Sequence, residues 1–279
     1  LDDIIVEKLK IKCGKPKLHA WEKFVEKVKN PSHDVKIAVC GKYVELHDSY
    51  KSIIESFVHA GVENNSRVKL EWIEAEHVEK EGAERYLNDI SGLLIPGGFG
   101  TRGTEGKIRA IQYARENKIP FFGICLGLQC AVIEFARNVC GLENANSTEF
   151  DEDTPYPVID LMEEQKRIKS KGGTMRLGSQ PCEIKRGTRA FQIYNRELIN
   201  ERHRHRYEVN NQYREMLEEH GMVLSGINPE LDLVEMIELT DHPWFVAGQF
   251  HPELKSRVLN AHPLFREFVK AALKYQKGG

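Results

Sequence analysis

The stretch PFFGICLGLQ (120–129) contains a cysteine between two glycines, after an apolar run and before the start of a helical pattern. We interpret it as a buried strand, a sharp turn at Cys125 and a helix. Side chains two positions either side of a residue on such a turn would collide, and glycine removes the clash. The N–H groups and dipole of the following helix would favour a thiolate. Two interpretations are open at this point: a buried cysteine at a strand end, or a nucleophile.

Strand-like and helix-like segments alternate from Val35 onward. Apolar runs lie at 35–41, 67–75, 92–98 and 120–124, and helical patterns occupy 48–61, 75–90 and 104–118. Continuous apolar runs of this kind are typical of strands that are buried on both faces. We therefore predict an α/β fold with a mostly parallel central sheet and helices on both faces. Functional residues are expected beyond the carboxyl ends of the strands.

The second half of the chain is richer in strand-like segments. They lie at 156–162, 180–186, 204–210, 222–228, 232–239 and 243–250. We therefore expect additional β-structure in the C-terminal half. The charged stretch EEQKRIKSKGG (163–173) is expected to be a loop.

The first 33 residues have a different character from the rest. One apolar stripe at helical spacing is followed by Pro31, and it consists of Leu18, Trp21, Phe24, Val25 and Val28. A stripe of this kind predicts an amphipathic helix that needs a partner surface. We interpret residues 1–33 as an interdomain linker with one amphipathic helix, and residues 34–279 as the main domain.

Composition excludes several classes of function. The 40 basic and 42 acidic residues give a net charge of -2, so no overall positive field favours nucleic acid or anionic lipid. No apolar run approaches the length of a membrane span, and the charged N-terminus does not resemble a secretion signal. The six cysteines are scattered without a CxxC pair, which predicts no metal site. A cytoplasmic, reducing location is the simplest expectation.

A nucleophilic cysteine needs a base, and His251 is the best placed of the 11 histidines. It follows an apolar strand-like run, and Glu253 lies two residues further on, so both side chains would face the same side of an extended chain. A carboxylate on one imidazole nitrogen would leave the other free to take the thiol proton. The alternative is a histidine at a strand end beside a solvated glutamate.

A glycine pair in PGGFG (96–100) follows another apolar run. Glycines there would let backbone amides approach a ligand, and the alternative is a simple tight turn. The sequence contains no GxxxxGK[ST] motif, so a nucleotide-hydrolysing P-loop is not indicated.

Three motifs, PGGFG (96–100), GICLGLQ (123–129) and QFHPE (249–253), together resemble the class I glutamine amidotransferase family. The resemblance implies that Cys125 attacks the carboxamide of glutamine and forms a thioester. It implies His251 as general base and acid, and Glu253 as the residue that orients His251. The backbone N–H groups of Gly98 and Leu126 would form the oxyanion hole.

Three further stretches, ENANSTEF (143–150), GGTMRLG (172–178) and ERHRHRYEVN (201–210), are similar to the C-terminal glutaminase domain of the CTP synthase family. That resemblance implies a glutamine-binding set of Phe99, Gln129, Glu149 and Arg206. An arginine can fork onto an α-carboxylate and a glutamate can receive an α-ammonium group. From the residues alone, the RHRHR run reads as a solvated basic edge.

The resemblance also implies what lies outside this chain. Members of the family carry an N-terminal amidoligase (synthetase) domain that uses UTP, ATP and magnesium, and nothing in these 279 residues corresponds to it. The expected partners are therefore L-glutamine, that synthetase domain, and GTP as an allosteric effector facing the TMRL stretch (174–177). No cofactor, nucleic acid or membrane partner is expected for this chain itself.

The predicted function is the glutaminase half of an enzyme that aminates UTP to CTP in pyrimidine nucleotide biosynthesis. One alternative is a related cysteine hydrolase, such as a γ-glutamyl hydrolase or a peptidase of similar fold. Glu149 and Arg206 argue against it because they suit a free amino acid. The other alternative is a regulatory module without catalysis, and the intact set of Cys125, His251 and Glu253 argues against that.

Overall fold

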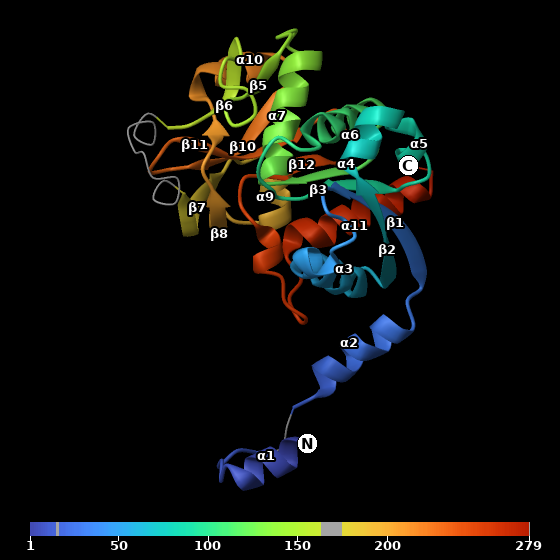
Figure 1. Cartoon of the computed structure of the whole chain (residues 1–279). Coiled ribbons are helices and arrows are strands. Elements are labelled where there is room, and N and C mark those ends of the chain that lie inside the picture. The colour runs from blue at the N-terminus through green and yellow to red at the C-terminus, as the bar shows by residue number, and fades with distance from the viewer. Residues whose placement is uncertain (15–16, 163–174, 279) are drawn as a thin grey trace.

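The computed structural model describes residues 1–14, 17–162 and 175–278 (Figure 1). The stretch 163–173, for which we predicted a loop, lies outside the described residues. Among the described residues, a sheet of nine strands crosses the domain in the order β2-β1-β3-β4-β12-β11-β10-β7-β8. A second sheet has the order β5-β6-β9.

The large sheet has a parallel half and an antiparallel half. The parallel strands are β2 (Ser66–Glu74), β1 (His33–Gly41), β3 (Gly92–Ile95), β4 (Phe121–Ile124) and β12 (Phe245–Gly248). The antiparallel extension continues through β11 (Leu233–Leu239), β10 (Met222–Asn228), β7 (Arg176–Ile184) and β8 (Leu198–His205). The small sheet consists of β5 (Ala145–Ser147), β6 (Tyr156–Asp160) and β9 (Glu208–Val209). The additional β-structure expected in the second half therefore extends the central sheet itself.

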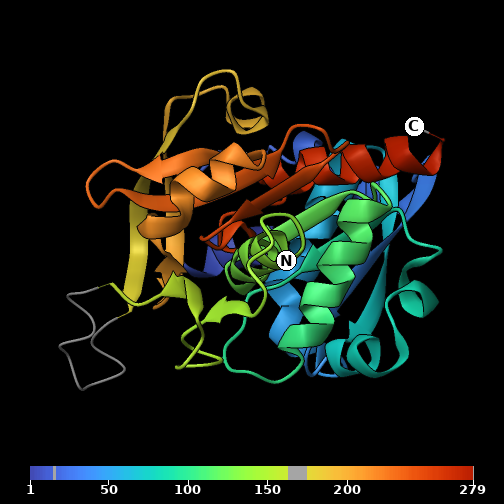
Figure 2. The same cartoon turned by 90° about the horizontal axis from the view of Figure 1, so that it is seen from above.

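Helices cover both faces of the large sheet (Figures 1 and 2). One face packs against α4 (Ala75–Glu81), α5 (Glu84–Leu87), α6 (Thr104–Glu116), α7 (Leu126–Asn138) and α10 (Arg214–Glu219). The other packs against α3 (Lys51–Glu63), α9 (Arg189–Tyr194) and α11 (Pro263–Gln276). Short 3-10 turns are η1 (His47–Tyr50), η3 (Asn211–Tyr213) and η4 (Pro252–Leu254).

Neighbouring residues of a central strand enter different cores. In β4, Phe121 belongs to the core under α6 and α7, whereas Phe122 belongs to the core under α3 and α11. Because successive side chains of a strand point to opposite faces, a strand covered on both sides must be apolar throughout. This is why the continuous apolar runs predicted the α/β fold, which is confirmed.

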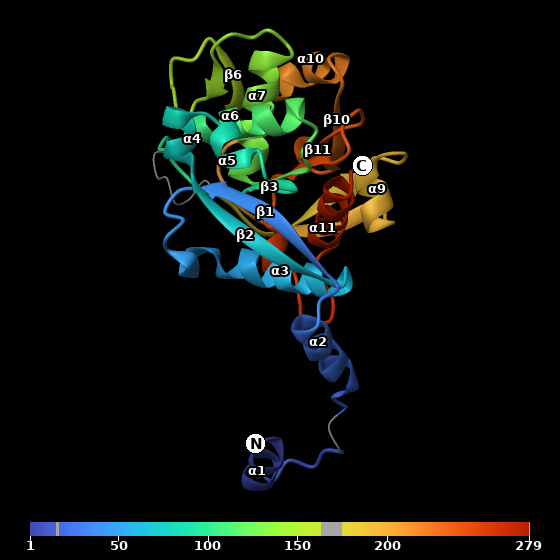
Figure 3. The same ribbon diagram turned by 90° about the vertical axis from the view of Figure 1, so that its right-hand side faces the viewer.

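The N-terminal segment contains two helices, α1 (Asp2–Lys8) and α2 (His19–Lys29), where we predicted one. The predicted amphipathic helix corresponds to α2, which leads into β1 and lies beside α3 (Figure 3). Phe24 of this helix approaches the ring of His59 with 6.3 Å between centroids. Trp21 keeps 48% of its surface exposed, so the apolar stripe is only partly covered by the domain.

The carboxyl ends of the central strands meet where α7 begins. A Cβ atom added at Gly127 would lie 2.2 Å from the carbonyl oxygen of Ile95 at the end of β3. A Cβ atom added at Gly123 would lie 2.8 Å from the carbonyl carbon of Gly127. Only glycine therefore allows α7 to start directly above β3 and β4. Within the described chain, no helix combines the length and apolar character needed to cross a membrane.

Substitution Gly127→Ala should lower the free energy of unfolding by about 3 kcal/mol, because the added methyl group meets backbone atoms that cannot move aside. Chemical denaturation monitored by circular dichroism measures the effect. Gly14→Ala is the control, since no heavy atom lies within 4 Å of its Cβ position. Equal stability of Gly127→Ala and the parent chain would contradict the close packing of α7 on β3.

Candidate active site

Cys125 occupies the turn between β4 and α7. Its backbone has φ 52° and ψ -101°, a combination that costs a non-glycine residue about 1–3 kcal/mol. The turn is held from both sides: the Cys125 N–H donates to the carbonyl oxygen of Gly248 at 2.8 Å, and its carbonyl oxygen accepts from Leu128 N at 3.0 Å. The side chain is 2% exposed and belongs to the lining of a cavity.

His251 and Glu253 form a pair at the end of the adjacent strand. Nδ1 of His251 lies 2.7 Å from Oε1 of Glu253, and the His251 N–H donates to the carbonyl oxygen of Arg202 at 2.7 Å. A Cβ atom added at Gly97 would lie 2.7 Å from Cε1 of His251 and 3.6 Å from Cβ of Cys125. Gly97 therefore lies against both the imidazole and the cysteine, where the segments that follow β3, β4 and β12 meet.

The imidazole of His251 interacts with two acidic groups. Burial of the ring disfavours the imidazolium, but the Cys125 side chain and the Glu253 carboxylate outweigh burial and raise the pKa of His251 to about 10. The Nε2 atom is buried and has no hydrogen-bond partner of ordinary geometry in the described chain. At neutral pH the ring is thus an imidazolium, which places a positive charge beside Cys125.

Burial raises the thiol pKa of four of the other five cysteines. It raises the pKa of Cys40 and Cys130 to about 12 and that of Cys140 to about 11. It also raises the pKa of Cys182. These thiols stay protonated near neutral pH, so they are poor nucleophiles.

A cavity of about 360 Å3 opens beside the Cys125 sulfur. Its lining brings together residues from five separate stretches of the chain, namely Gly98, Phe99, Gly100, Cys125, Gln129, Glu149, Glu152, Met175, His205, Arg206 and Tyr207. The four residues that the sequence assigns to substrate binding are all in this set. Leu126 does not line the cavity, but it is the first residue of α7, so its N–H lacks an intrahelical partner. Its side chain lies 3.2 Å from the position of a Cβ at Gly98.

The polar groups of the cavity are held by specific contacts. Oε1 of Glu149 accepts a hydrogen bond from Gly100 N at 2.9 Å, and Nε2 of Gln129 donates to the carbonyl oxygen of Tyr207 at 2.9 Å. Nε of Arg206 is buried without a hydrogen-bond partner in the described chain. The site therefore presents an oriented carboxylate, from Glu149, and a guanidinium with an unused donor, from Arg206, in the same cavity as the cysteine.

A buried ion-pair network supports one wall of the cavity. Arg176 contacts the carboxylates of Glu208 at 3.0 Å and Glu235 at 2.7 Å, and Nε2 of His205 lies 2.7 Å from Glu208. In β8 the side chains of Glu201, His203 and His205 are buried, and the intervening arginines face outward. The RHRHR run, which we expected to be a solvated basic edge, therefore has its histidines in the interior. The alternation of side chains along a strand could have predicted this.

Sequence reasoning missed Gln249. Its Nε2 lies 3.6 Å from the Cys125 sulfur, and its Oε1 accepts from Nε2 of Gln129 at 3.2 Å. The rule that placed His251 and Glu253 on one side of an extended chain applies to Gln249 as well, since it lies two residues before His251. Tyr207 and His205 were also missed, because their place in the wall depends on the pairing of β8.

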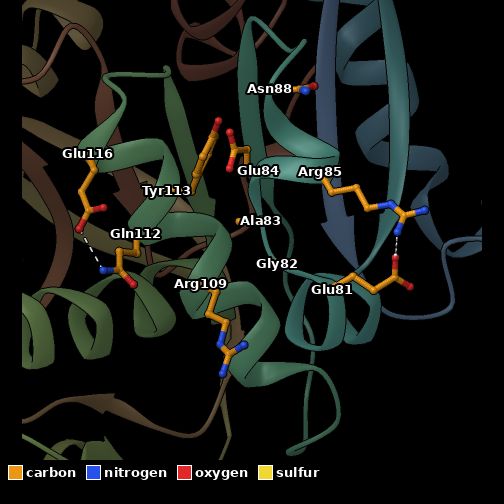
Figure 4. A pocket seen from close by; sticks show the side chains of 10 residues that line it. All are labelled: Glu81, Gly82, Ala83, Glu84, Arg85, Asn88, Arg109, Gln112, Tyr113 and Glu116. Carbon is orange, nitrogen blue, oxygen red and sulfur yellow. Dashed lines mark hydrogen bonds and ion pairs between the residues drawn. The ribbon is translucent and has the colours of Figure 1, made fainter.

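A second hollow, of about 650 Å3, lies over α4, α5 and α6 (Figure 4). Its polar side chains already have partners: Arg85 contacts Glu81 at 2.9 Å, Gln112 donates to Glu116 at 2.9 Å, and Arg109 donates to the carbonyl oxygen of Glu79 at 2.7 Å. It contains none of the predicted site residues, and we interpret it as a solvated surface groove. Among the described residues, no group of three or more His, Cys, Asp or Glu side chains could hold a metal ion.

Comparisons with known proteins show which family this chain resembles in sequence. The family model for glutamine amidotransferase class-I matches residues 45–271. A CTP synthase from Caldanaerobacter subterraneus is 60% identical over 273 residues, covering 98% of this chain and 51% of the relative. A CTP synthase from Carboxydothermus hydrogenoformans is 58% identical over 277 residues, covering 99% and 52%. The chain thus spans about half the length of these curated relatives.

One solved structure matches closely in shape. It is the glutaminase domain of a Trypanosoma brucei CTP synthase with bound acivicin, with a TM-score of 0.81 and 37% identity. The match covers 86% of this chain and 94% of that domain.

Cys125→Ala should lower the pKa of His251 from about 10 by more than about one unit, because burial continues to disfavour the imidazolium after the sulfur is removed. NMR titration of the imidazole Cε1–H signal measures it. Glu253→Gln should act in the same direction. An unchanged pKa in both variants would show that neither partner holds the proton on His251.

Proposed function

The chain belongs to the class I glutamine amidotransferase family, and we propose that it hydrolyses L-glutamine to glutamate and ammonia through a thioester on Cys125. It is homologous to the glutaminase portion of CTP synthases. The observation that carries the proposal is the convergence of Cys125, His251 and Glu253 beside a cavity that holds both Glu149 and Arg206.

The chemistry follows from these groups. The Cys125 thiolate attacks the carboxamide carbon of glutamine, and the oxyanion that forms accepts hydrogen bonds from the N–H groups of Gly98 and Leu126. The imidazolium of His251 gives its proton to the departing ammonia, and the carbon–nitrogen bond breaks. Neutral His251 then takes a proton from water as the hydroxide attacks the thioester. The carbon–sulfur bond breaks, and the thiolate and the imidazolium are restored. The new γ-carboxylic acid releases its proton to solvent, and glutamate leaves as its carboxylate.

The amino acid end of the substrate fits the far part of the cavity. Arg206 has a buried Nε without a partner in the described chain, and we assign it to the α-carboxylate. Glu149, which Gly100 N orients, receives the α-ammonium group. Phe99 forms a partly exposed side of the mouth, and Lys42 donates to its carbonyl oxygen.

In the whole enzyme, we propose that the ammonia aminates UTP to CTP in a synthetase domain that uses ATP and magnesium. The length of the relatives, about twice that of this chain, supports the presence of such a domain. Residues 1–33 then serve as the linker to it, and the exposed stripe of α2 gives that linker a surface for contact. GTP is the proposed effector, and the first residue of the 174–177 stretch assigned to it lies outside the described residues. All six cysteines are free, which fits the proposed cytoplasmic location.

A glutamine-like diazoketone should alkylate this chain once, at Cys125, because that cysteine, alone among the six, lines the cavity and lies beside the His251 imidazolium. Peptide mass spectrometry measures the adduct, and the reaction needs no turnover. Excess glutamine should suppress it, and Cys125→Ala should abolish it. Labelling spread over the other cysteines, or none at Cys125 with a synthetase domain and GTP also present, would refute the catalytic role.

Arg206→Leu and Glu149→Gln should each raise the KM for glutamine about ten- to hundredfold, because each removes a charged partner of the substrate. Steady-state ammonia release measures KM. Alkylation of Cys125 by iodoacetamide should keep its rate, since that reagent uses neither contact. Arg67→Leu is the matched control, because Arg67 is an exposed arginine at the opposite end of the sheet. If alkylation falls as much as glutamine turnover, the substrate assignment is wrong.

A further inference from the structure

Gln249 is a fully buried polar residue that the mechanism above does not use. It lies between the end of β12 and His251, and its side chain is 0% exposed. Its Nε2 atom lies 3.6 Å from the Cys125 sulfur, within the distance of an N–H···S hydrogen bond. The contact joins a strand end directly to the atom that attacks the substrate.

The orientation of the Gln249 amide is determined by its neighbour. Nε2 of Gln129 donates one hydrogen to the carbonyl oxygen of Tyr207 at 2.9 Å and the other to Oε1 of Gln249 at 3.2 Å. An amide nitrogen has two hydrogens, so Gln129 must face an acceptor on both sides. Gln249 therefore turns its oxygen to Gln129 and its N–H group to the sulfur of Cys125.

We propose that Gln249 is a further catalytic residue, whose side-chain N–H donates a hydrogen bond to the sulfur of Cys125. The inference deepens the proposed glutaminase function and rests on it. In the resting enzyme the N–H stabilises the thiolate. When water opens the thioester, the same N–H stabilises the sulfur as it leaves.

The surroundings of the sulfur explain why a second donor is needed. Cys125 is almost completely buried, and a charge in such a place is costly unless hydrogen-bond donors surround it. The imidazolium of His251 supplies one positive partner from the side of Gly97. A hydrogen bond to an ionised acceptor is stronger than one to a neutral acceptor, so the N–H of Gln249 favours the thiolate over the thiol.

The same arrangement separates the roles of the two glutamines. Both amide hydrogens of Gln129 are used, so only its Oε1 remains to accept from a substrate ammonium group in the cavity. Gln249 does not line the cavity, and its nitrogen serves the sulfur alone. Loss of Gln249 should therefore act mainly on kcat, and loss of Gln129 mainly on the KM for glutamine.

The test uses the 279-residue chain with Gln249→Met, which keeps the length of the side chain but has no donor. The rate of Cys125 alkylation by iodoacetamide is measured by mass spectrometry from pH 5 to 10. We expect the midpoint of the profile to move up by about one pH unit, which is an approximately tenfold smaller thiolate fraction at neutral pH. We also expect kcat to fall by about tenfold or more, with KM changing less than about threefold.

A second variant, Gln249→Glu, keeps the shape and the acceptor for Gln129 but places a carboxylate oxygen against the sulfur. The midpoint should move in the same direction. Gln192→Glu adds the same charge at an exposed position on α9 and should leave the profile unchanged. Thermal unfolding of each variant establishes that it is folded.

An unchanged midpoint in both folded Gln249 variants would overturn the inference. So would a raised KM with unchanged kcat, because that pattern would mean that Gln249 acts only by holding Gln129. The proposed function fails in a different way: the parent chain would neither release ammonia nor react with the diazoketone. The iodoacetamide profile would still report on the contact between Gln249 and Cys125 in that case.

Discussion

The backbone of Cys125 is the constraint on which the rest of the structure depends. A non-glycine residue at φ 52° is unfavourable, and it persists only where the surroundings leave no other conformation. Here β4 ends immediately before the residue and α7 begins immediately after it. Gly123 and Gly127 allow α7 to pack directly on β3 and β4, at distances that leave no room for a Cβ atom. The stability of a large parallel core thus holds the buried Cys125 side chain at the cavity above the sheet.

The site is a product of topology as well as of local geometry. β3, β4 and β12 run parallel and side by side, so the residues after each strand meet at one edge, although they are far apart in the sequence. Gly97 lies in the first of these segments, Cys125 in the second and His251 in the third. The antiparallel extension adds β8, in which the carbonyl oxygen of Arg202 accepts a hydrogen bond from the His251 N–H. Arg206 follows the last residue of this strand and lines the cavity.

Local patterns in the sequence were sufficient for the strand–turn–helix around Cys125 and for the pairing of His251 with Glu253. Both depend on neighbours within a few residues. The order of β12, β11, β10, β7 and β8 could not be predicted, because strand pairing depends on distant segments. Gln249 was missed for the same reason: its contact with sulfur exists only because β12 lies beside β4. Helix α1 was also missed: it spans only seven residues and buries none of them, so its few apolar side chains extend over too few turns to establish a periodicity.

The contrast among the cysteines bears on how this chain responds to oxidants. Burial keeps the thiols of Cys40, Cys130 and Cys140 protonated, and thiols react with peroxide far more slowly than thiolates do. A small oxidant entering the cavity meets the sulfur of Cys125 beside the His251 imidazolium and converts it first to a sulfenic acid. Oxidation would therefore inactivate the site without damaging the fold. Ammonia production would stop while the core remained intact, and a reductant would restore ammonia production.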